Sequence, residues 1–374
     1  MGHAHPSLVM LLSTTALFVL THPVRAQGVL AVSGPLTEIA PLSPAGEVQL
    51  EQPIGATRLS DGTVVVGDAR LATVSFFDGK GARITTAGRR GAGPGEFNGL
   101  WWMGQCARDT VFAWDRANNR VTVIASGGQS LRDITPPLPA AASGRTAFAT
   151  CSRSGHFGFV SLPTQMNPQQ LIQRSPATVT VVSRNGDASS IGNGIASSEF
   201  VMRGGGGAPR PLGHTTTIAL SGDRVYVGTG DSAAVLAFTP DGKPLSVVRV
   251  PLAVSRPVSE GQYDLAIDDL LLLAPPNAAG AIRSMMQELP RPERLPHYHG
   301  IHNDPSGNLW LVQAAPGDKT RLIGVDPTGR ALGSVQLPEH IRVWEVGDDY
   351  VLGQRHNSNG EPFIVVYGLE RRRR

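Results

Sequence analysis

A β-rich unit of similar length recurs along most of the chain and restricts the fold more than any other feature of the sequence. Each unit contains an apolar β run, a polar turn, a second and a third β run, and a turn rich in Asp and Gly. Val65, Phe112 and Phe159 occupy matching positions in the first three units and follow one another at intervals of about 47 residues. Repeats of about 40–50 residues that are built from short strands are typical of β-propellers.

Six such units can be placed between residues 27 and 370. Their central runs are 62–67, 110–114, 155–160, 223–227, 308–312 and 349–352. The sixth unit ends without a fourth strand, and Leu36–Leu42 can supply one, which would close the ring and remove an exposed sheet edge. The 44 glycines and 29 prolines separate many short β runs, as in turn-rich all-β folds. The sequence therefore predicts an all-β fold, a six-bladed β-propeller with four-stranded blades and an N-terminal strand that closes the last blade.

One segment, 255–295, does not follow the repeat. Apolar residues in 263–270 and 281–289 recur at the spacing of a helix, so we expect a short helical insertion between the fourth and fifth blades. About 40 residues is near the lower limit for an independent core, and the insertion is expected to pack on the ring rather than to form a domain.

The N-terminus has the pattern of a secretory signal peptide. An apolar run, Leu8–Leu20, precedes Val24-Arg25-Ala26, a small-residue cleavage pattern, and the run is shorter than the ~20 residues of a membrane span. We expect residues 1–26 to be removed, with no transmembrane anchor afterwards and a periplasmic or secreted location. Since such compartments are oxidising, the two cysteines, Cys106 and Cys151, at similar places in adjacent units, are predicted to form a disulfide.

The charge of the chain gives no support for nucleic-acid binding. The formal net charge is +3, but Arg371 to Arg374 form a basic tail that contributes four positive charges, so the rest of the chain carries −1. No basic stripe with interleaved aromatic residues is present. We expect no nucleic-acid partner, and we expect a monomer.

Several turns resemble those of a known propeller group. The segment Gly88-Arg-Arg-Gly-Ala-Gly-Pro-Gly-Glu-Phe97 is similar to the Gly-x-Gly-Pro-Gly-Glu-Phe element that opens a blade in NHL-repeat propellers. Asp304-Pro-Ser-Gly-Asn-Leu-Trp310 and Asp326-Pro-Thr-Gly-Arg330 resemble other turns of that group. The resemblance covers most of residues 30–370 and implies a secreted bacterial six-bladed propeller of unassigned activity, so it concerns fold far more than function.

In a propeller the loops between blades and the loops after each second strand gather at one mouth of the central channel, which is the expected site. On this basis we predict a ligand-binding rim formed by Arg89, Arg90, Asp115, Arg116, Arg210, Asp231 and His356. Polar, Gly- and Pro-rich loops on a rigid scaffold suit recognition, so the first hypothesis is a binding module for a peptide, glycan or protein partner, without a cofactor.

Histidines support a second hypothesis. His297 and His299 would share one face of a strand, and His214 lies before the inner strand of the fourth unit. Neutral imidazoles in such a set suit Zn²⁺ or Cu²⁺. The alternative is therefore a metal-dependent hydrolase or lyase, similar to the propeller lactonases or amidoglycolate lyases, although neither family's carboxylate and Asn pattern can be placed in this sequence.

The signal peptide yields a direct prediction. When the full chain is produced in a Gram-negative host, the exported protein should begin at or near Gln27, because cleavage is expected after Ala26. Intact-mass measurement of the periplasmic fraction checks this, and a periplasmic protein that retains residues 1–26 would contradict it.

Overall fold

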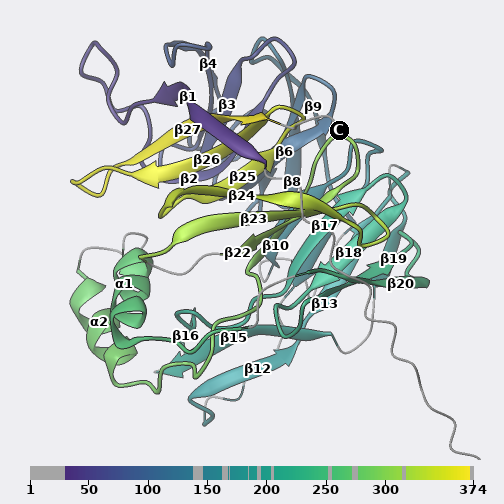
Figure 1. Ribbon diagram of the computed structural model, residues 1–374. Coiled ribbons are helices and arrows are strands. Elements are labelled where there is room, and N and C mark those ends of the chain that lie inside the picture. The colour runs from purple at the N-terminus through teal and green to yellow at the C-terminus, as the bar shows by residue number, and fades with distance from the viewer. Residues whose placement is uncertain are drawn as a thin grey trace, which may run out of the picture.

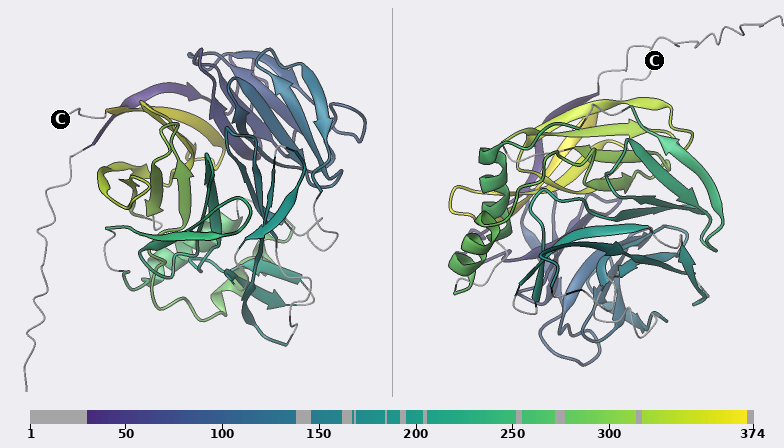
Figure 2. Two further views of the ribbon diagram at one scale, coloured as in Figure 1. Left: turned by 90° about the vertical axis from the view of Figure 1, so that its right-hand side faces the viewer. Right: turned by 90° about the horizontal axis from the view of Figure 1, so that it is seen from below.

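The computed structural model describes residues 30–137, 146–161, 167, 169–183, 185–191, 195–203, 206–251, 255–271, 277–313 and 317–370. The predicted signal peptide and the basic tail lie outside these residues. Six four-stranded antiparallel sheets surround a central axis, which confirms the six-bladed β-propeller (Figures 1 and 2).

The first three blades follow the chain from residue 53. Blade 1 contains β2 (Pro53–Arg58), β3 (Val64–Asp68), β4 (Thr73–Phe77) and β5 (Arg83–Ala87). Blade 2 contains β6 (Leu100–Ala107), β7 (Thr110–Asp115), β8 (Arg120–Ala125) and β9 (Ser130–Ile134). Blade 3 contains β10 (Thr146–Cys151), β11 (Phe157–Ser161), β13 (Thr178–Val182) and β14 (Ala188–Ile191).

The remaining blades complete the circle. Blade 4 contains β17 (Thr217–Ser221), β18 (Arg224–Gly228), β19 (Ala234–Phe238) and β20 (Pro244–Arg249). Blade 5 contains β21 (Gly300–Asn303), β22 (Leu309–Gln313), β23 (Lys319–Val325) and β24 (Ala331–Glu339). Blade 6 contains β25 (Arg342–Val346), β26 (Tyr350–His356), β27 (Pro362–Glu370) and, from the N-terminal end, β1 (Ala31–Ile39).

The ring is closed by β1, as the sequence predicts. β1 pairs antiparallel with β27 from Ala31↔Glu370 to Ile39↔Ile364, and the two strands lie side by side in Figure 1. The pairing begins before the predicted Leu36–Leu42 and ends within it. Because β1 occupies the outer position of blade 6, β27 has a partner on both sides and presents no free edge.

The hairpin turns explain how the repeated sequence produces the blades. In 78–82, the Asp78 carboxylate accepts hydrogen bonds from the amides of Lys80 (2.8 Å) and Ala82 (2.9 Å). Gly81 has φ +83°, a conformation that side chains with a Cβ rarely adopt. The same arrangement recurs in 326–330, where Asp326 accepts from Thr328 and Arg330 and Gly329 has φ +89°. The Asp and Gly positions of the repeat are therefore turn positions.

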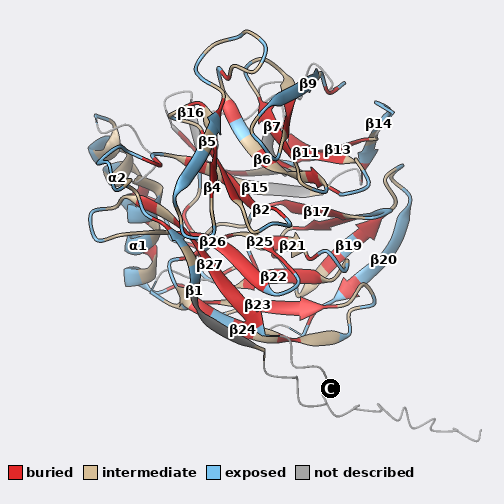
Figure 3. Cartoon of the chain, turned by 90° about the horizontal axis from the view of Figure 1, so that it is seen from above, coloured by how far each residue is buried: buried red, intermediate tan, exposed pale blue. Residues whose placement is uncertain are grey.

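Burial follows the radius of the ring. The second and third strands of the blades are mostly buried, and outer strands such as β5, β9 and β20 are mostly exposed (Figure 3). Apolar clusters fill the spaces between neighbouring blades, for example where Trp114 of blade 2 meets Phe159 of blade 3 with ring centroids 5.3 Å apart. Stability therefore depends on contacts between blades as well as within them.

A layer outside the repeat covers one face of the ring, and we call it the cap. It contains α1 (Glu260–Leu271), α2 (Ala279–Gln287) and a three-stranded sheet of β12 (Ile172–Pro176), β15 (Ala196–Arg203) and β16 (Gly206–Pro209). These elements are inserted after a second strand or between blades, so they emerge on the same face, and Val201 of β15 packs with Tyr263 and Met286 of the helices. The helices lie inside the predicted segment, whereas the sheet was not predicted.

The start of α1 is fixed by a reciprocal pair of hydrogen bonds. The Ser259 hydroxyl accepts from the amide of Gln262 (3.2 Å), and the Gln262 side chain accepts from the amide of Ser259 (3.3 Å). This is the Ser-x-x-Gln capping box that satisfies amides at a helix N-terminus. Among the described residues, no helix is long and apolar enough to cross a membrane.

The closing strand makes a prediction about stability. Ile39 is fully buried against blade 1 and blade 6 residues, whereas Leu36 in the same strand is 55% exposed. Ile39→Ala should lower the free energy of unfolding by about 3 kcal/mol, because it removes buried methyl groups and leaves a cavity. Leu36→Ala is the matched control and should change it by less than about 0.5 kcal/mol. Urea denaturation measures both, and equal effects would show that β1 does not close the core.

Candidate ligand-binding channel

The centre of the ring is a cavity of about 580 Å³. Residues from all six inner strands, β2, β6, β10, β17, β21 and β25, line it, and each inner strand contacts the next around the circle. All six strands run from the cap face to the opposite face, because each follows a loop of the cap face. Ser198 of the cap also lines the cavity, so the cap reaches the channel at that end.

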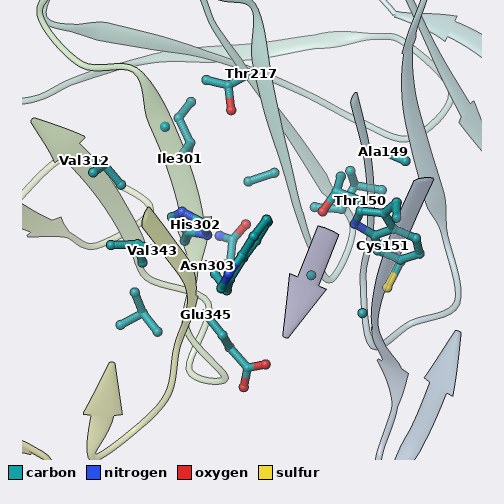
Figure 4. Close-up of a pocket in the computed structure, with 18 of the residues that line it drawn as sticks. Ala149, Thr150, Cys151, Thr217, Ile301, His302, Asn303, Val312, Val343 and Glu345 are labelled. Carbon is teal, nitrogen blue, oxygen red and sulfur yellow. The ribbon is translucent and has the colours of Figure 1, made fainter. Parts of the chain in front are cut away.

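The walls of the channel differ in character. Figure 4 shows His302 and Asn303 of β21 on one side of the cavity and Ala149, Thr150 and Cys151 of β10 on the other. Apolar side chains alternate with hydroxyl, amide and charged groups, as in pockets that orient a small ligand. The cavity is therefore a chemically mixed site held by the most central strands of the fold.

A disulfide forms part of this wall. Cys106 near the end of β6 and Cys151 at the end of β10 are bonded, with their Cα atoms 5.4 Å apart. Cys106 is buried, and Cys151 lines the cavity. The bond joins the inner strands of two adjacent blades and restricts their separation at the channel.

A cluster of basic groups lies toward the cap end of the channel. His299 comes just before β21, His302 lies within it, and Arg342 begins the adjacent inner strand β25. The side chains of His299 and Arg342 are exposed, but to channel water, since the inner strands surround them. The guanidinium of Arg342 lies over the Trp344 ring, with Cζ 4.0 Å from the ring centroid.

The enclosure of these groups changes their titration. Burial, and then the charge of Arg342, lowers the pKa of His299 to about 4. Burial, then His299 and Arg342, lowers the pKa of His302 to about 4, and burial lowers the pKa of Arg342 to about 10. At neutral pH both imidazoles are therefore neutral and Arg342 is charged.

A carboxyl group lies deeper in the channel. Glu345 of β25 accepts hydrogen bonds from the hydroxyl groups of Thr57 in blade 1 and Tyr350 in blade 6. Burial raises the pKa of Glu345, and these two hydrogen bonds oppose the increase. Glu345 therefore links blades 1 and 6 at the channel wall.

The seven residues predicted as a ligand-binding rim do not form the channel wall. None of them is among the described residues that line the cavity. Arg89 pairs with Glu96 (2.7 Å), Arg90 donates to the carbonyl of Arg70 (2.9 Å), and the Arg116 guanidinium stacks over Trp101 at 3.6 Å. These three arginines make local contacts at the corner between blades 1 and 2.

Asp115, one of the predicted rim residues, has a structural position. Its side chain is fully buried and accepts hydrogen bonds from the amides of Asn98, Gly99, Ala117 and Asn118 and from the Asn118 side chain (2.6–3.1 Å). Asp68 holds the equivalent turn of blade 1 by similar bonds. In the structure the Asp115 carboxylate ties the second strand of the blade to the entry of the first.

Arg210 and Asp231 belong to an ion-pair network under the cap. Arg174 of β12 holds Asp231 with two hydrogen bonds (2.6 and 2.7 Å), while Arg210 pairs with Glu199 of β15 (2.9 Å) and donates to the carbonyl of Pro290 (2.6 Å). His214 lies between the two carboxylates, 2.8 Å from Glu199 and 3.4 Å from Asp231. The network attaches the cap to blade 4.

The pKa of Glu199 is lowered to about 2, chiefly by the hydrogen bond from His214. Burial raises this pKa, and the hydrogen bond and charge of Arg210 lower it further. At Asp231 burial alone would raise the pKa, but the bonds from Arg174 and Thr229 outweigh it and lower the pKa. Both carboxylates are therefore charged at all ordinary pH values.

The predicted metal triad is not assembled. His214 is held by the two carboxylates under the cap, and His299 lines the channel, whereas His297 does not. The strand β21 begins only at Gly300, so the alternation expected for His297 and His299 does not apply. Among the described residues, no three His, Cys, Asp or Glu side chains are grouped to hold a metal ion.

His356 lies near the cap end of the channel, at the end of β26, with its Nε2 3.3 Å from Gln354. Burial lowers its pKa, and the charge of Asp269 in α1 opposes that decrease. Arg342, His302 and Glu345 were not predicted as site residues, although charged residues within the otherwise apolar run 342–346 are a signal of a channel-facing strand.

Comparisons with known proteins agree with the fold. No family model and no curated protein matches the sequence. A member of the DUF4221 family from Bacteroides vulgatus is similar in structure, with a TM-score of 0.53, 11% identity, and coverage of 92% of this chain and 98% of that chain. A candidate exported protein of Bacteroides fragilis has a TM-score of 0.50, 13% identity, and coverage of 94% and 98%.

A virginiamycin B lyase from Staphylococcus aureus is more distant, with a TM-score of 0.42, 12% identity, and coverage of 84% of this chain and 94% of that chain. At these identities the likeness concerns the propeller fold alone. The NHL resemblance seen in the turns is not matched by a family model and stays a prediction.

The network under the cap makes a prediction about pH. Glu199 has a pKa of about 2 in the folded protein, compared with an ordinary value of 4.5. Its charge therefore contributes about 3 kcal/mol to the free energy of unfolding above pH 4.5, and this contribution is lost as the pH falls toward 2. Glu199→Gln should therefore be less stable than the unchanged protein at pH 7 and nearly equal to it at pH 2.

Urea denaturation at a series of pH values measures this difference. Glu47→Gln is the control, because Glu47 pairs with Arg83 on the surface and its side chain is 67% exposed. The control should change stability by less than about 1 kcal/mol at any pH. A loss at Glu199 that does not depend on pH would contradict the assignment.

Proposed function

We propose that this protein is a binding module that holds its ligand in the central channel, entered near the cap. The ligand is a small molecule, or the end of a peptide, a glycan or a protein partner. The observation that supports this most is the cavity itself, because its volume of about 580 Å³ is in the range of small-molecule sites.

The construction of the wall also supports binding. The inner strands are joined to buried second strands, and the Cys106–Cys151 disulfide and the bonds of Glu345 link neighbouring blades at the channel. A wall of this kind loses little conformational freedom when a ligand enters, which favours affinity. Hydroxyl groups of Thr150 and Thr217 and the amide of Asn303 offer hydrogen bonds to the ligand.

Binding is favoured over metal-dependent hydrolysis or elimination. The second hypothesis requires His214, His297 and His299 to converge, and in the described part of the chain they occupy three different environments. Binding requires only a shaped cavity with suitably placed polar groups.

We place the protein outside the cytoplasm. Support comes from the signal-peptide pattern of residues 1–26 and from the disulfide, which is typical of oxidising compartments. In that location a rigid channel would be used to retain a ligand from the periplasm or the surroundings.

A neutral fluorescent probe tests the channel as a binding site. N-phenyl-1-naphthylamine should bind the protein with increased fluorescence, and Thr150→Trp should weaken its binding at least tenfold, because the indole would fill the cavity. The control is Ser246→Trp, which places the same indole on the exposed outer strand β20 and should leave binding unchanged. Circular dichroism and urea denaturation verify that both variants are folded.

Two results would contradict the proposal. One is a folded protein that does not bind the probe, and the other is binding that Thr150→Trp and Ser246→Trp affect equally. In either case the channel would not be the binding site.

A further inference from the structure

Arg342 is a cation placed inside the channel without an ion-pair partner in the described part of the structure. Its side chain is open to the cavity, where the guanidinium lies over the Trp344 ring. A guanidinium that faces an enclosed cavity with no carboxylate beside it is well suited to pair with an anionic ligand. The arrangement indicates that the negative partner of Arg342 comes from a ligand.

Carboxylates near this part of the channel have other partners. Glu345 lies in the same strand, but its two oxygens accept from Thr57 and Tyr350. Asp304 lies at the far end of β21, where its oxygens accept from Asn308 and from the indole of Trp310. Neither carboxylate is within ion-pair distance of Arg342, and the charge of Asp269 in α1 acts on His340 and His356 rather than on Arg342.

The stacking of Arg342 on Trp344 determines how a ligand can approach. With one face of the guanidinium over the indole at 4.0 Å, the N–H groups at its edge stay available. A guanidinium edge donates two parallel hydrogen bonds to a carboxylate, sulfonate or phosphate, which a neutral hydroxyl cannot reproduce. The stacked geometry therefore favours an oxyanion.

His299 and His302 complete the group. His302 lies in β21 and His299 just before it, next to β25. Arg342 lowers the pKa of both imidazoles, and His299 also lowers that of His302. As neutral imidazoles, each carries one N–H that can donate to an oxyanion without adding charge repulsion to the empty channel. Protonation would add a second donor and a positive charge once an anion is present.

We propose that the channel ligand carries an oxyanion, which Arg342 binds at the cap end with His299 and His302 as additional donors. This inference depends on the proposed function, since it names the chemical class of the ligand for the same channel. The low dielectric of the enclosed site strengthens the attraction between Arg342 and the anion.

Proton uptake is a consequence of this arrangement. The groups whose charge acts on the two imidazoles are Arg342 and, for His302, also His299. Asp269 and His340 act on His356, at the end of β26, instead. In the free protein His299 and His302 become protonated only near pH 4. An anion bound beside them raises their pKa, so affinity for the anion should increase as the pH falls toward 5.

A matched pair of probes tests the proposal. 8-Anilino-1-naphthalenesulfonate differs from N-phenyl-1-naphthylamine by one sulfonate group, which stays charged over the pH range used. In the unchanged protein the sulfonate probe should bind at least tenfold more tightly than the neutral probe. Arg342→Met should weaken the sulfonate probe about ten- to a hundredfold, the usual effect of losing a hydrogen-bonded charge, and leave the neutral probe within threefold.

Two further variants make the result specific. Arg342→Lys keeps the charge and should recover part of the affinity, although it loses the two-pronged geometry. Arg249→Met removes an arginine from the exposed outer strand β20 and should not alter either probe. The double variant His299→Gln, His302→Gln should remove most of the increase in sulfonate affinity between pH 8 and pH 5.

The possible outcomes separate the two proposals. The oxyanion inference is wrong if the sulfonate adds no affinity, or if Arg342→Met and Arg249→Met have the same effect. As long as Thr150→Trp still weakens binding of the neutral probe, the channel remains a binding site in either case. If neither probe responds to Thr150→Trp, the proposed function itself is wrong. Titration with phosphate and acetate as competitors then distinguishes the kind of oxyanion preferred.

Discussion

Six inner strands that run in the same direction around one axis determine the position of every other part of this molecule. Their alignment places the first residue of each inner strand at one mouth of the channel and the last residue at the other. His299 and Arg342 therefore meet at the cap end although more than forty residues separate them in the sequence, while Arg153 and Asp304 lie at the far end. Residues that are far apart in the sequence therefore share one end of the channel as a result of strand direction.

The cap gives this symmetric ring a difference between its two faces. Among the described residues, the loops on one face are short hairpin turns, and in several of them Asp and Gly satisfy local backbone groups, as at Asp78 and Gly81. The other has two helices and a three-stranded sheet with an apolar cluster of their own, attached to blade 4 through His214 and Asp231. A ligand that enters near the cap therefore meets a structured surface before it reaches Arg342.

The sequence predicts the blades well because each blade is built from neighbouring hairpins. A regular repeat and turns with Asp and Gly are enough to locate β3, β7 and β11. The sheet of the cap could not be predicted in this way, since β12 pairs with β15 across the strands of blade 3, and nothing local to Ile172 indicates its partner Val201. Long-range pairing of short polar strands leaves no periodic signal.

The site was less accessible from the sequence than the fold. Asp115 looks like a rim residue because a charged residue ends a buried strand, yet its carboxylate is used by nearby backbone amides and by the Asn118 side chain. His299 was predicted to bind a metal, and the structure places it in the channel near Arg342. Arg342 matters because it has no carboxylate partner among the described residues. Pairing of charges is a property of three-dimensional neighbours and cannot be read from one strand.

The pairing of β1 with β27 has a consequence for the order of folding. Ala31 and Glu370 are partners, so this contact spans nearly the whole chain and has a large loop-closure entropy. Blades 1 to 5 contain only strands that are close in sequence and can form hairpins before the ends of the chain meet, whereas blade 6 stays incomplete until β1 has paired with β27. The channel, whose wall requires all six blades, is therefore among the last features of the protein to form, and contacts of such high sequence separation are typical of slow steps in folding.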